Sequence, residues 1–189
     1  MLAVDFNWEG AGFRPGGTAQ TNAVTEKFDR ELAATIKIPV RKANVMSEGG
    51  GRDLNGKGTL LLVDQLDMDG NKKLRKYQIE EEYKKALGIK KIIWLNSGLL
   101  EDERLDNGPV WKDLYPVGAG GHIDLFCRFA GPNTILLAQV TEKERASSPI
   151  EAINYHKLEE NYEILKNSTD QDGKPFNIIR IPVGPHMTA

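Results

Sequence analysis

The residues best suited to chemistry lie in a glycine-rich segment, residues 118–124, which reads Gly-Ala-Gly-Gly-His-Ile-Asp. Its position before an apolar run predicts the start of a β-strand, so the side chains of His122 and Asp124 would project from the same face. A neighbouring histidine and aspartate can exchange protons with a substrate and hold a cation. The alternative is that Asp124 satisfies His122 by a local hydrogen bond and that neither residue takes part in chemistry.

A loop of 26 residues, 96–121, leads to this pair and shows no clear secondary structure. Loops of this length within compact domains are usually functional or disordered. The loop carries the acidic run Glu101-Asp102-Glu103 together with Trp111 and Tyr115, a mixture that suits a cationic, partly apolar ligand. The alternative is a solvated run of charge, which we favour for Glu103 and Asp106.

A second glycine cluster, Glu48-Gly49-Gly50-Gly51, lies between two predicted strands and contains one carboxylate. Three glycines permit the close approach of another backbone, and a flexible hairpin is the alternative. The turn that follows, at Asn55-Gly56, has the sequence of a tight hairpin turn. A phosphate-binding loop is excluded because no Lys-Ser or Lys-Thr pair opens a helix here.

The chain has one cysteine, Cys127, which excludes an internal disulfide and a cysteine-rich zinc site. By strand alternation Cys127 faces away from His122 and Asp124, on the same side as Ile123 and Leu125. A buried thiol has a raised pKa and little reactivity, so we expect Cys127 to belong to the hydrophobic core. The histidine spacings of common metal sites, His-x-His and HExxH, do not occur, and no metal site is predicted.

The composition bounds the class of protein. The chain has 189 residues, 40% hydrophobic and 28% charged, with 25 basic and 27 acidic side chains and a net charge of −2. This balance excludes a disordered chain and argues against a general nucleic-acid binder. The longest apolar stretches are only a few residues long, so no membrane span or secretory signal is predicted. We expect a cytoplasmic, mixed α/β domain.

The elements that must position these residues follow from the spacing of apolar side chains. Short runs rich in β-branched residues follow each predicted helix, and apolar strands precede two of them. Helices are expected over 22–34, 74–87 and 149–167, and strands at Val4 and over 36–45, 58–63, 89–95, 122–130, 133–140 and 177–183.

Local signals support the helices. The first places Val24, Phe28 and Leu32 on one face, and Gly88 ends the second in the position of a left-handed cap. Ser148 is the N-cap of the third, with a proline in the first helical position and a glutamate that completes a capping box.

The order β-β-α-β occurs about twice, with a partial β-α-β unit before it. This pattern predicts a weak internal repeat, an array of three modules with open ends that resembles a segment of a larger ring. The alternative is an open α/β sandwich that is complete in itself.

Five short motifs, in order from about residue 4 to residue 183, resemble those of the agmatine deiminase and Porphyromonas-type peptidyl-arginine deiminase family. Together they cover nearly the whole chain. They are Asp5-Phe6-Asn7-Trp8, Glu48-Gly-Gly followed by Gly56-Lys-Gly58, Ile-Ile-Trp94-Leu, Gly-Gly-His122-Ile-Asp124 and Arg180-Ile-Pro182.

The resemblance implies the pentein fold, a pseudo-symmetric ring of ββαβ modules around a central pocket. This chain would then be a partial pentein of about three modules within one domain, 1–183, at 1–46, 47–97 and 120–183, with a tail at 184–189. The implied reaction is hydrolysis of the guanidinium group of agmatine or of peptidyl-arginine to a ureido group and ammonia. Agmatine as the substrate would imply a role in putrescine biosynthesis. No cofactor is implied.

The resemblance also implies roles for individual residues. His122 falls on the general acid/base of the family, and Asp124 falls on a carboxylate that binds the guanidinium. Glu48 and Trp8 fall on motif positions of the substrate site. Asp102 is a candidate acid in the loop before the histidine motif.

Two departures concern the nucleophile and a second aspartate. The family's Trp-x-Arg-Asp segment and its cysteine segment do not occur in this sequence, and Cys127 does not match the nucleophile. We therefore expect the attacking thiol outside this chain, and the chain alone to be inactive. The alternative is a non-catalytic pentein module that binds a guanidinium ligand or complements a partner chain. A homo-oligomer is compatible with either, whereas nucleic acid and membrane are not expected partners.

Overall fold

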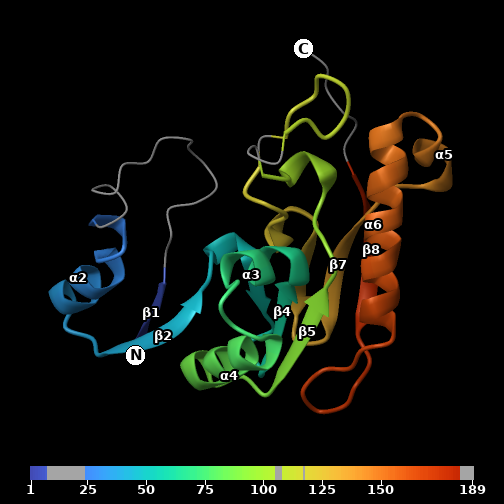
Figure 1. The fold of residues 1–189 in the computed structure, drawn as a ribbon. Helices are drawn as coiled ribbons and strands as arrows, with labels where there is room; N and C mark the ends of the chain where they lie inside the picture. Colours follow the sequence, from blue (N-terminus) through green and yellow to red (C-terminus); the bar gives the residue numbers. More distant parts are fainter. Residues whose placement is uncertain (8–23, 105–107, 117, 184–189) are drawn as a thin grey trace.

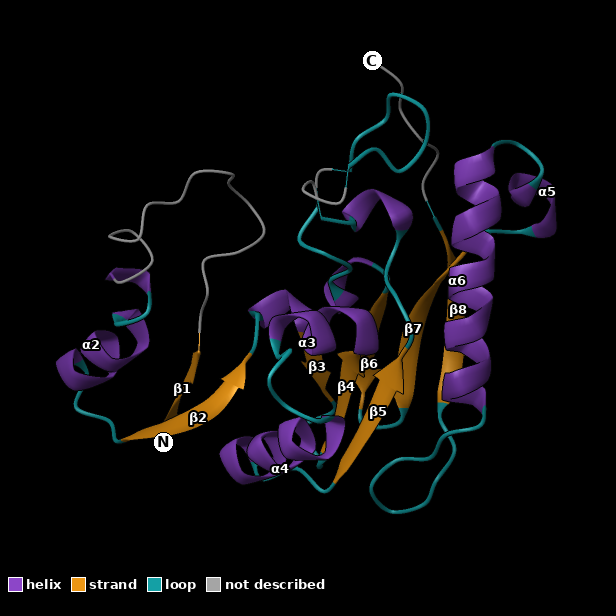
Figure 2. Cartoon of the chain, viewed as in Figure 1, coloured by secondary structure: helices purple, strands orange, loops and turns teal. Residues whose placement is uncertain are grey.

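The structure is a computed structural model, which describes residues 1–7, 24–104, 108–116 and 118–183. Within these residues the chain forms three small sheets, which follow one another across the molecule in chain order (Figure 1). In each sheet, a connection that contains a helix joins two parallel strands (Figure 2). The predicted mixed α/β class is confirmed.

The first sheet contains two parallel strands, β1 (Ala3–Asn7) and β2 (Val40–Met46), joined through α2 (Phe28–Thr35). The predicted strand over 36–45 begins later than expected, because residues 36–39 form the turn that leaves α2. The predicted apolar face of the helix points to solvent, with exposed fractions of 69% for Val24 and 62% for Phe28. The start of the predicted helix, residues 22 and 23, lies outside the described residues.

The second sheet has the order β3 (Arg52–Leu54), β4 (Thr59–Val63), β5 (Lys91–Leu95). β3 is antiparallel to β4, whereas β5 is parallel to it. The connection from β4 to β5 contains α3 (Asp64–Gly70), which the sequence analysis did not predict, and α4 (Lys76–Leu87). α4 ends as predicted at Gly88, which has a φ of 69° in the left-handed region.

The third sheet repeats this arrangement with β6 (Cys127–Gly131), β7 (Thr134–Gln139) and β8 (Asn177–Pro182). β6 is antiparallel and β8 parallel to the central strand. The connection contains a short helix, α5 (Glu142–Arg145), and the long α6 (Pro149–Lys166). The Ser148 hydroxyl caps α6 as predicted, because it accepts a hydrogen bond from the backbone N–H of Glu151 at 3.2 Å. The order β-β-α-β therefore occurs twice.

The hydrophobic core consists of two clusters that share β4. Every residue of β4 is buried. Leu61 and Val63 belong to a cluster that also contains the apolar residues of β5, β7 and α6. Leu60 and Leu62 point the other way, into a cluster with residues of β1, β2 and α4. β4 thereby joins the first sheet to the second and the second to the third.

A polar contact also joins the second and third sheets. The Asn55 carboxamide oxygen accepts hydrogen bonds from the backbone N–H groups of residues 57, 58 and 59, which forms the predicted hairpin turn. Its nitrogen donates to the carbonyl of Pro132 and to the Gln171 side chain, both at 2.9 Å.

Among the described residues, no helix has both the length and the apolar character needed to cross a lipid bilayer.

A buried carboxylate lies beside the cluster that contains Leu60 and Leu62. Asp67, on α3, is 4% exposed, and its Oδ1 lies 2.7 Å from the hydroxyl oxygen of Tyr83 on α4. Burial disfavours the charged form and raises the pKa of Asp67 to about 7, although the Tyr83 hydrogen bond and the Arg52 charge oppose the shift.

This shift predicts a pH dependence of stability. Because the folded protein binds the Asp67 proton more tightly than the unfolded chain, the free energy of unfolding should fall as the pH rises from about 4 to about 7. Asp67→Asn should remove a part of this fall, on the order of 1–3 kcal/mol, in urea titrations across that range. Asp69→Asn, at an exposed position of the same helix, is the matched control. Equal slopes for wild type and Asp67→Asn would contradict the prediction.

Candidate functional site

Three predicted site residues from two distant segments lie together. Glu48 follows β2 and opens a short 3-10 turn, Gly49–Gly51, and His122 precedes a second one, Ile123–Leu125. The Nε2 atom of His122 lies 2.6 Å from Oε2 of Glu48, and its Nδ1 atom lies 4.0 Å from Oδ1 of Asp124. The imidazole thus has a carboxylate beside each of its nitrogens.

The expected strand at His122 is wrong at its start. Residues 123–125 form a 3-10 turn, and β6 begins only at Cys127. The left-handed backbone of Gly120 and Gly121, with φ of 103° and 96°, bends the chain sharply just before the histidine. Ile123 is buried as expected, but Leu125 is 56% exposed, because the turn breaks the alternation that a strand would have imposed.

The side chain of Asp102 stabilises this bend by hydrogen bonds to its backbone. Its Oδ1 accepts a hydrogen bond from the backbone N–H of Ala119 at 2.9 Å. Its Oδ2 accepts from the N–H groups of Gly121, at 3.0 Å, and of His122, at 2.5 Å. Asp102 is 5% exposed, so its carboxylate is committed to the backbone that carries His122. The sequence analysis placed Asp102 near the site but did not anticipate these contacts.

Glycines make this close packing sterically feasible. A Cβ atom at Gly118 would lie 2.2 Å from the Cα of Asp102, and one at Gly98 would lie 2.6 Å from the Cα of Gly121. Both obstacles are backbone atoms, which cannot move aside as side-chain ends can. Any larger residue at either position would push the loop away from Asp102.

The rest of the acidic loop is attached to α6. Glu101 accepts a hydrogen bond from the Asn154 side chain at 2.7 Å, and Glu103 forms an ion pair with Lys157 at 2.7 Å. The expectation that Glu103 belongs to a solvated charge run is wrong, since its side chain is 13% exposed. Asp106, predicted with it, lies outside the described residues, as does Trp8.

The electrostatics favour a protonated imidazole. Burial lowers the pKa of His122, but the hydrogen bond and charge of Glu48, with the charges of Asp102 and Asp124, outweigh it and leave the pKa above its ordinary value. A histidine with a raised pKa holds its proton to a higher pH than an ordinary histidine and can deliver it to a leaving group.

The two carboxylates beside His122 differ in access. The Glu48 side chain is 5% exposed and already paired with the imidazole, whereas the Asp124 side chain is 38% exposed. Asp124 is therefore the carboxylate available to an incoming cation, and a planar forked cation is the partner that a carboxylate binds best. In the described part of the chain, no three His, Cys, Asp or Glu residues are arranged to hold a metal ion.

Cys127 belongs to the core, as predicted. It is 2% exposed and packs within the cluster shared by the second and third sheets. Burial and the charge of Asp53 raise the pKa of its thiol far above the ordinary value. A thiol in this state supplies little thiolate for nucleophilic attack.

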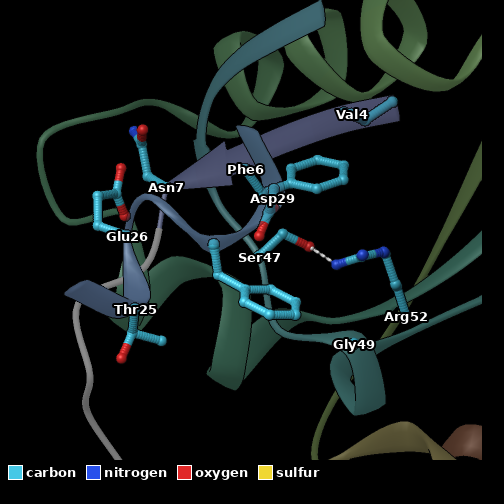
Figure 3. A pocket seen from close by; sticks show the side chains of 10 residues that line it. Val4, Phe6, Asn7, Thr25, Glu26, Asp29, Ser47, Gly49 and Arg52 are labelled. Carbon is cyan, nitrogen blue, oxygen red and sulfur yellow. Dashed lines mark hydrogen bonds between the residues drawn. The ribbon is translucent and has the colours of Figure 1, made fainter. Parts of the chain in front are cut away.

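A cavity of about 270 Å³ adjoins the Glu48 turn (Figure 3). Its walls come from β1, from residues 25–29 and from the segment of Ser47, Gly49 and Arg52. Figure 3 shows the hydrogen bond between Arg52 and Ser47 on one side of this space. The sequence analysis missed Arg52, although its hydrogen-bond partners, the Ser47 hydroxyl and the Glu48 carbonyl, lie only five and four residues before it.

The geometry predicts different outcomes at two neighbouring glycines. A Cβ atom at Gly50 would lie 2.6 Å from Nδ1 of His122 and 2.9 Å from both carboxylate oxygens of Asp124, whereas one at Gly49 would meet nothing within 4 Å. Gly50→Ala should displace both side chains and shift the pKa of His122, followed by NMR, by roughly half a unit or more. The cost in stability should stay below about 1 kcal/mol, because only side-chain ends must move.

Gly49→Ala is the matched control, with the same change in the same turn. It should leave the His122 titration as in the wild type. Equal effects of the two substitutions would show that the packing of Gly50 against His122 and Asp124 is not what sets the geometry of the pair.

Comparison with known sequences gives a consistent family. The profile of Porphyromonas-type peptidyl-arginine deiminases matches residues 1–188. An agmatine deiminase of Medicago truncatula is 32% identical over 192 residues, which cover 100% of this chain and 46% of the relative. An agmatine deiminase of Pseudomonas syringae pv. tomato is 31% identical over 185 residues, which cover 95% of this chain and 44% of the relative. The chain thus spans about half the length of the curated relatives it matches.

Similar solved structures come from the same family. The agmatine deiminase of Enterococcus faecalis superimposes with a TM-score of 0.70 at 21% identity, over 96% of this chain and 44% of that one, and shows the shared fold. The agmatine deiminase of C. jejuni with substrate bound gives a TM-score of 0.67 at 25% identity, over 100% of this chain and 47% of that one. With the profile match over almost its whole length, the chain belongs to the family of agmatine deiminases and Porphyromonas-type peptidyl-arginine deiminases.

Proposed function

We propose that this chain supplies the proton-transfer and guanidinium-binding half of a deiminase site, which converts agmatine or peptidyl-arginine to the ureido product and ammonia. The observation that carries the proposal is the placement of His122 between the buried Glu48 and the accessible Asp124. Family membership supports the same chemistry.

In the proposed reaction Asp124 binds the planar guanidinium by charge-assisted hydrogen bonds and orients its carbon. A thiolate attacks that carbon, and His122 donates a proton to the departing nitrogen, which leaves as ammonia. His122 then takes a proton from a water molecule that attacks the same carbon. The carbon–sulfur bond breaks, and the new hydroxyl group loses its remaining proton to solvent, which releases the ureido product and the thiolate. Glu48 stabilises the charged imidazole while it carries the proton.

We propose that the attacking thiol comes from outside these 189 residues. The chain has one cysteine, and its burial within the core argues against a role as nucleophile. In this proposal the chain forms modules 1–46, 47–97 and 120–183 of a pentein ring, and further modules complete the pocket. The two copies of the β-β-α-β order support a modular ring.

Asp102 and Trp8 take different parts in this proposal. Asp102 positions the backbone of His122 rather than touching the substrate, since its carboxylate is occupied by backbone N–H groups. Trp8 remains a proposed substrate-binding residue on its motif position alone.

A second candidate function is binding of a guanidinium ligand without turnover, or complementation of a partner chain. The burial of the single thiol favours it for the chain taken alone. The two candidates agree on Asp124 as the residue that holds the cation, so they differ in product formation and not in binding.

The proposed role of Asp124 in binding predicts that agmatine affinity depends on the charge of its carboxylate. Asp124→Asn removes the charge that pairs with the guanidinium and should weaken agmatine binding, measured by calorimetry, by roughly tenfold or more. Asp172→Asn, at an exposed position near the third sheet, is the matched control and should bind as the wild type does. Equal binding by Asp124→Asn and wild type would remove Asp124 from the site.

The catalytic half predicts no product from this chain alone. A ureido colour assay with agmatine and with an arginine-containing peptide should give the same background for wild type and Cys127→Ser, because the Cys127 thiol is buried. Product that forms with the wild type and vanishes in Cys127→Ser would show that Cys127 is the nucleophile. That result would overturn the proposal of an external thiol.

A further inference from the structure

A chain of hydrogen-bonded side chains leads from the Glu48 turn into the core. Nη1 of Arg52 donates to the Ser47 hydroxyl at 2.5 Å and to the backbone carbonyl of Glu48 at 3.0 Å. The Tyr83 hydroxyl oxygen lies 2.7 Å from Ser47 Oγ and 2.7 Å from Asp67 Oδ1. Arg52 lies on β3, Asp67 on α3 and Tyr83 on α4, and Ser47 directly follows β2, so four segments meet at this network.

The hydrogen bonds of this network can all point in one direction, from the cation Arg52 to the anion Asp67. Tyr83 carries one hydroxyl proton, and Asp67 accepts a hydrogen bond from it when the Asp67 carboxyl group is ionised, above its pKa of about 7. The Ser47 hydroxyl can then donate to the Tyr83 oxygen and accept from Arg52. Each hydroxyl therefore accepts one hydrogen bond and donates another, and Arg52 and Asp67 occupy the two charged ends.

Arg52 is held on further sides. Its guanidinium carbon lies 4.3 Å from the centre of the Phe6 ring, a cation–π contact. Burial lowers the pKa of Arg52, and the charges of Tyr83, Asp67 and Asp29 oppose that change. An arginine with these contacts is a fixed point against which a flexible segment can be anchored.

The Glu48 turn is a segment whose own sequence places few restrictions on its backbone. Three consecutive glycines follow Glu48, and glycine restricts its backbone less than any other residue. The Glu48 carbonyl accepts hydrogen bonds from Arg52 and from the backbone N–H of Gly51, at 3.1 Å. Only the first of these ties the turn to the core.

We propose that Arg52 is a positioning residue, which fixes the Glu48 turn and through it the contact between Glu48 and His122. Ser47, Tyr83 and Asp67 hold the guanidinium in place for this task. The inference rests on the proposed function, since the Glu48–His122 pair is the one that moves protons there. The arrangement itself is measurable without substrate.

The sign of one change separates this role from a simple charge effect. The contact with Glu48 raises the pKa of His122. Loss of the Arg52 anchor should loosen this contact, and the pKa of His122 should therefore fall. Loss of a nearby positive charge, acting through space alone, would make the imidazole easier to protonate and would raise the same pKa. A purely structural role would lower the melting temperature and leave the pKa unchanged.

The experiment is an NMR titration of His122 in the 189-residue chain, with its signal assigned by His122→Gln. Arg52→Met should lower the pKa of His122 by roughly half a unit or more, and Arg52→Lys, which keeps one donor, should restore part of the loss. Arg41→Met, which removes an exposed arginine from β2, should leave the pKa unchanged. A constant or raised pKa in Arg52→Met overturns the proposal.

A double-mutant cycle identifies the route. Glu48→Gln should lower the pKa of His122, and Arg52→Met should add no further decrease in that background, because its effect passes through Glu48. Full additivity would contradict the proposal. If Arg52→Met does not fold, Ser47→Ala removes the group where Arg52 and Tyr83 meet and should give the same direction of change. Because none of these readouts uses agmatine, failure of the binding prediction and failure of this one are independent.

Discussion

Burial of β4 on both faces is the constraint on which the rest of the molecule depends. A strand that alternates its side chains between two apolar clusters must be covered on both sides. On one face of β4, the first sheet and α4 pack against the second sheet. On the other face, the third sheet and α6 pack against it. The segment of Glu48 follows the first sheet, and the segment of His122 leads into the third sheet. The packing on the two faces of β4 therefore brings the Glu48 turn and the histidine together.

The site itself is built from backbone as much as from side chains. Asp102 uses both carboxylate oxygens to hold three backbone N–H groups of the loop before β6. The Glu48 turn meets that loop through Gly50, where no side chain intervenes. Two glycine-rich segments are thus needed, one to be bent by Asp102 and one to approach it.

Local signals predicted the elements well, and distant contacts explain what they missed. Ser148 and Gly88 marked helix ends because caps depend on a few neighbouring residues, and the apolar run of β4 indicated burial. α3 has only two apolar residues in seven, too few to show a period. The 3-10 turn at Ile123 follows from a bend imposed by Asp102, some twenty residues earlier in the chain. Glu103 appeared solvated because its partner Lys157 lies far away in the sequence. The proximity of His122 and Asp124 was predictable, whereas their approach to Glu48 and the anchor at Arg52 required the tertiary structure.

The separation of 74 residues between Glu48 and His122 has a consequence for how the site comes into being. Contacts between residues so far apart form late, because the chain must first lose the entropy of closing a long loop. Neither sheet can hold the pair alone, and partly folded forms that have one sheet without the other lack the contact between Glu48 and His122. That contact therefore forms together with the docking of the second and third sheets.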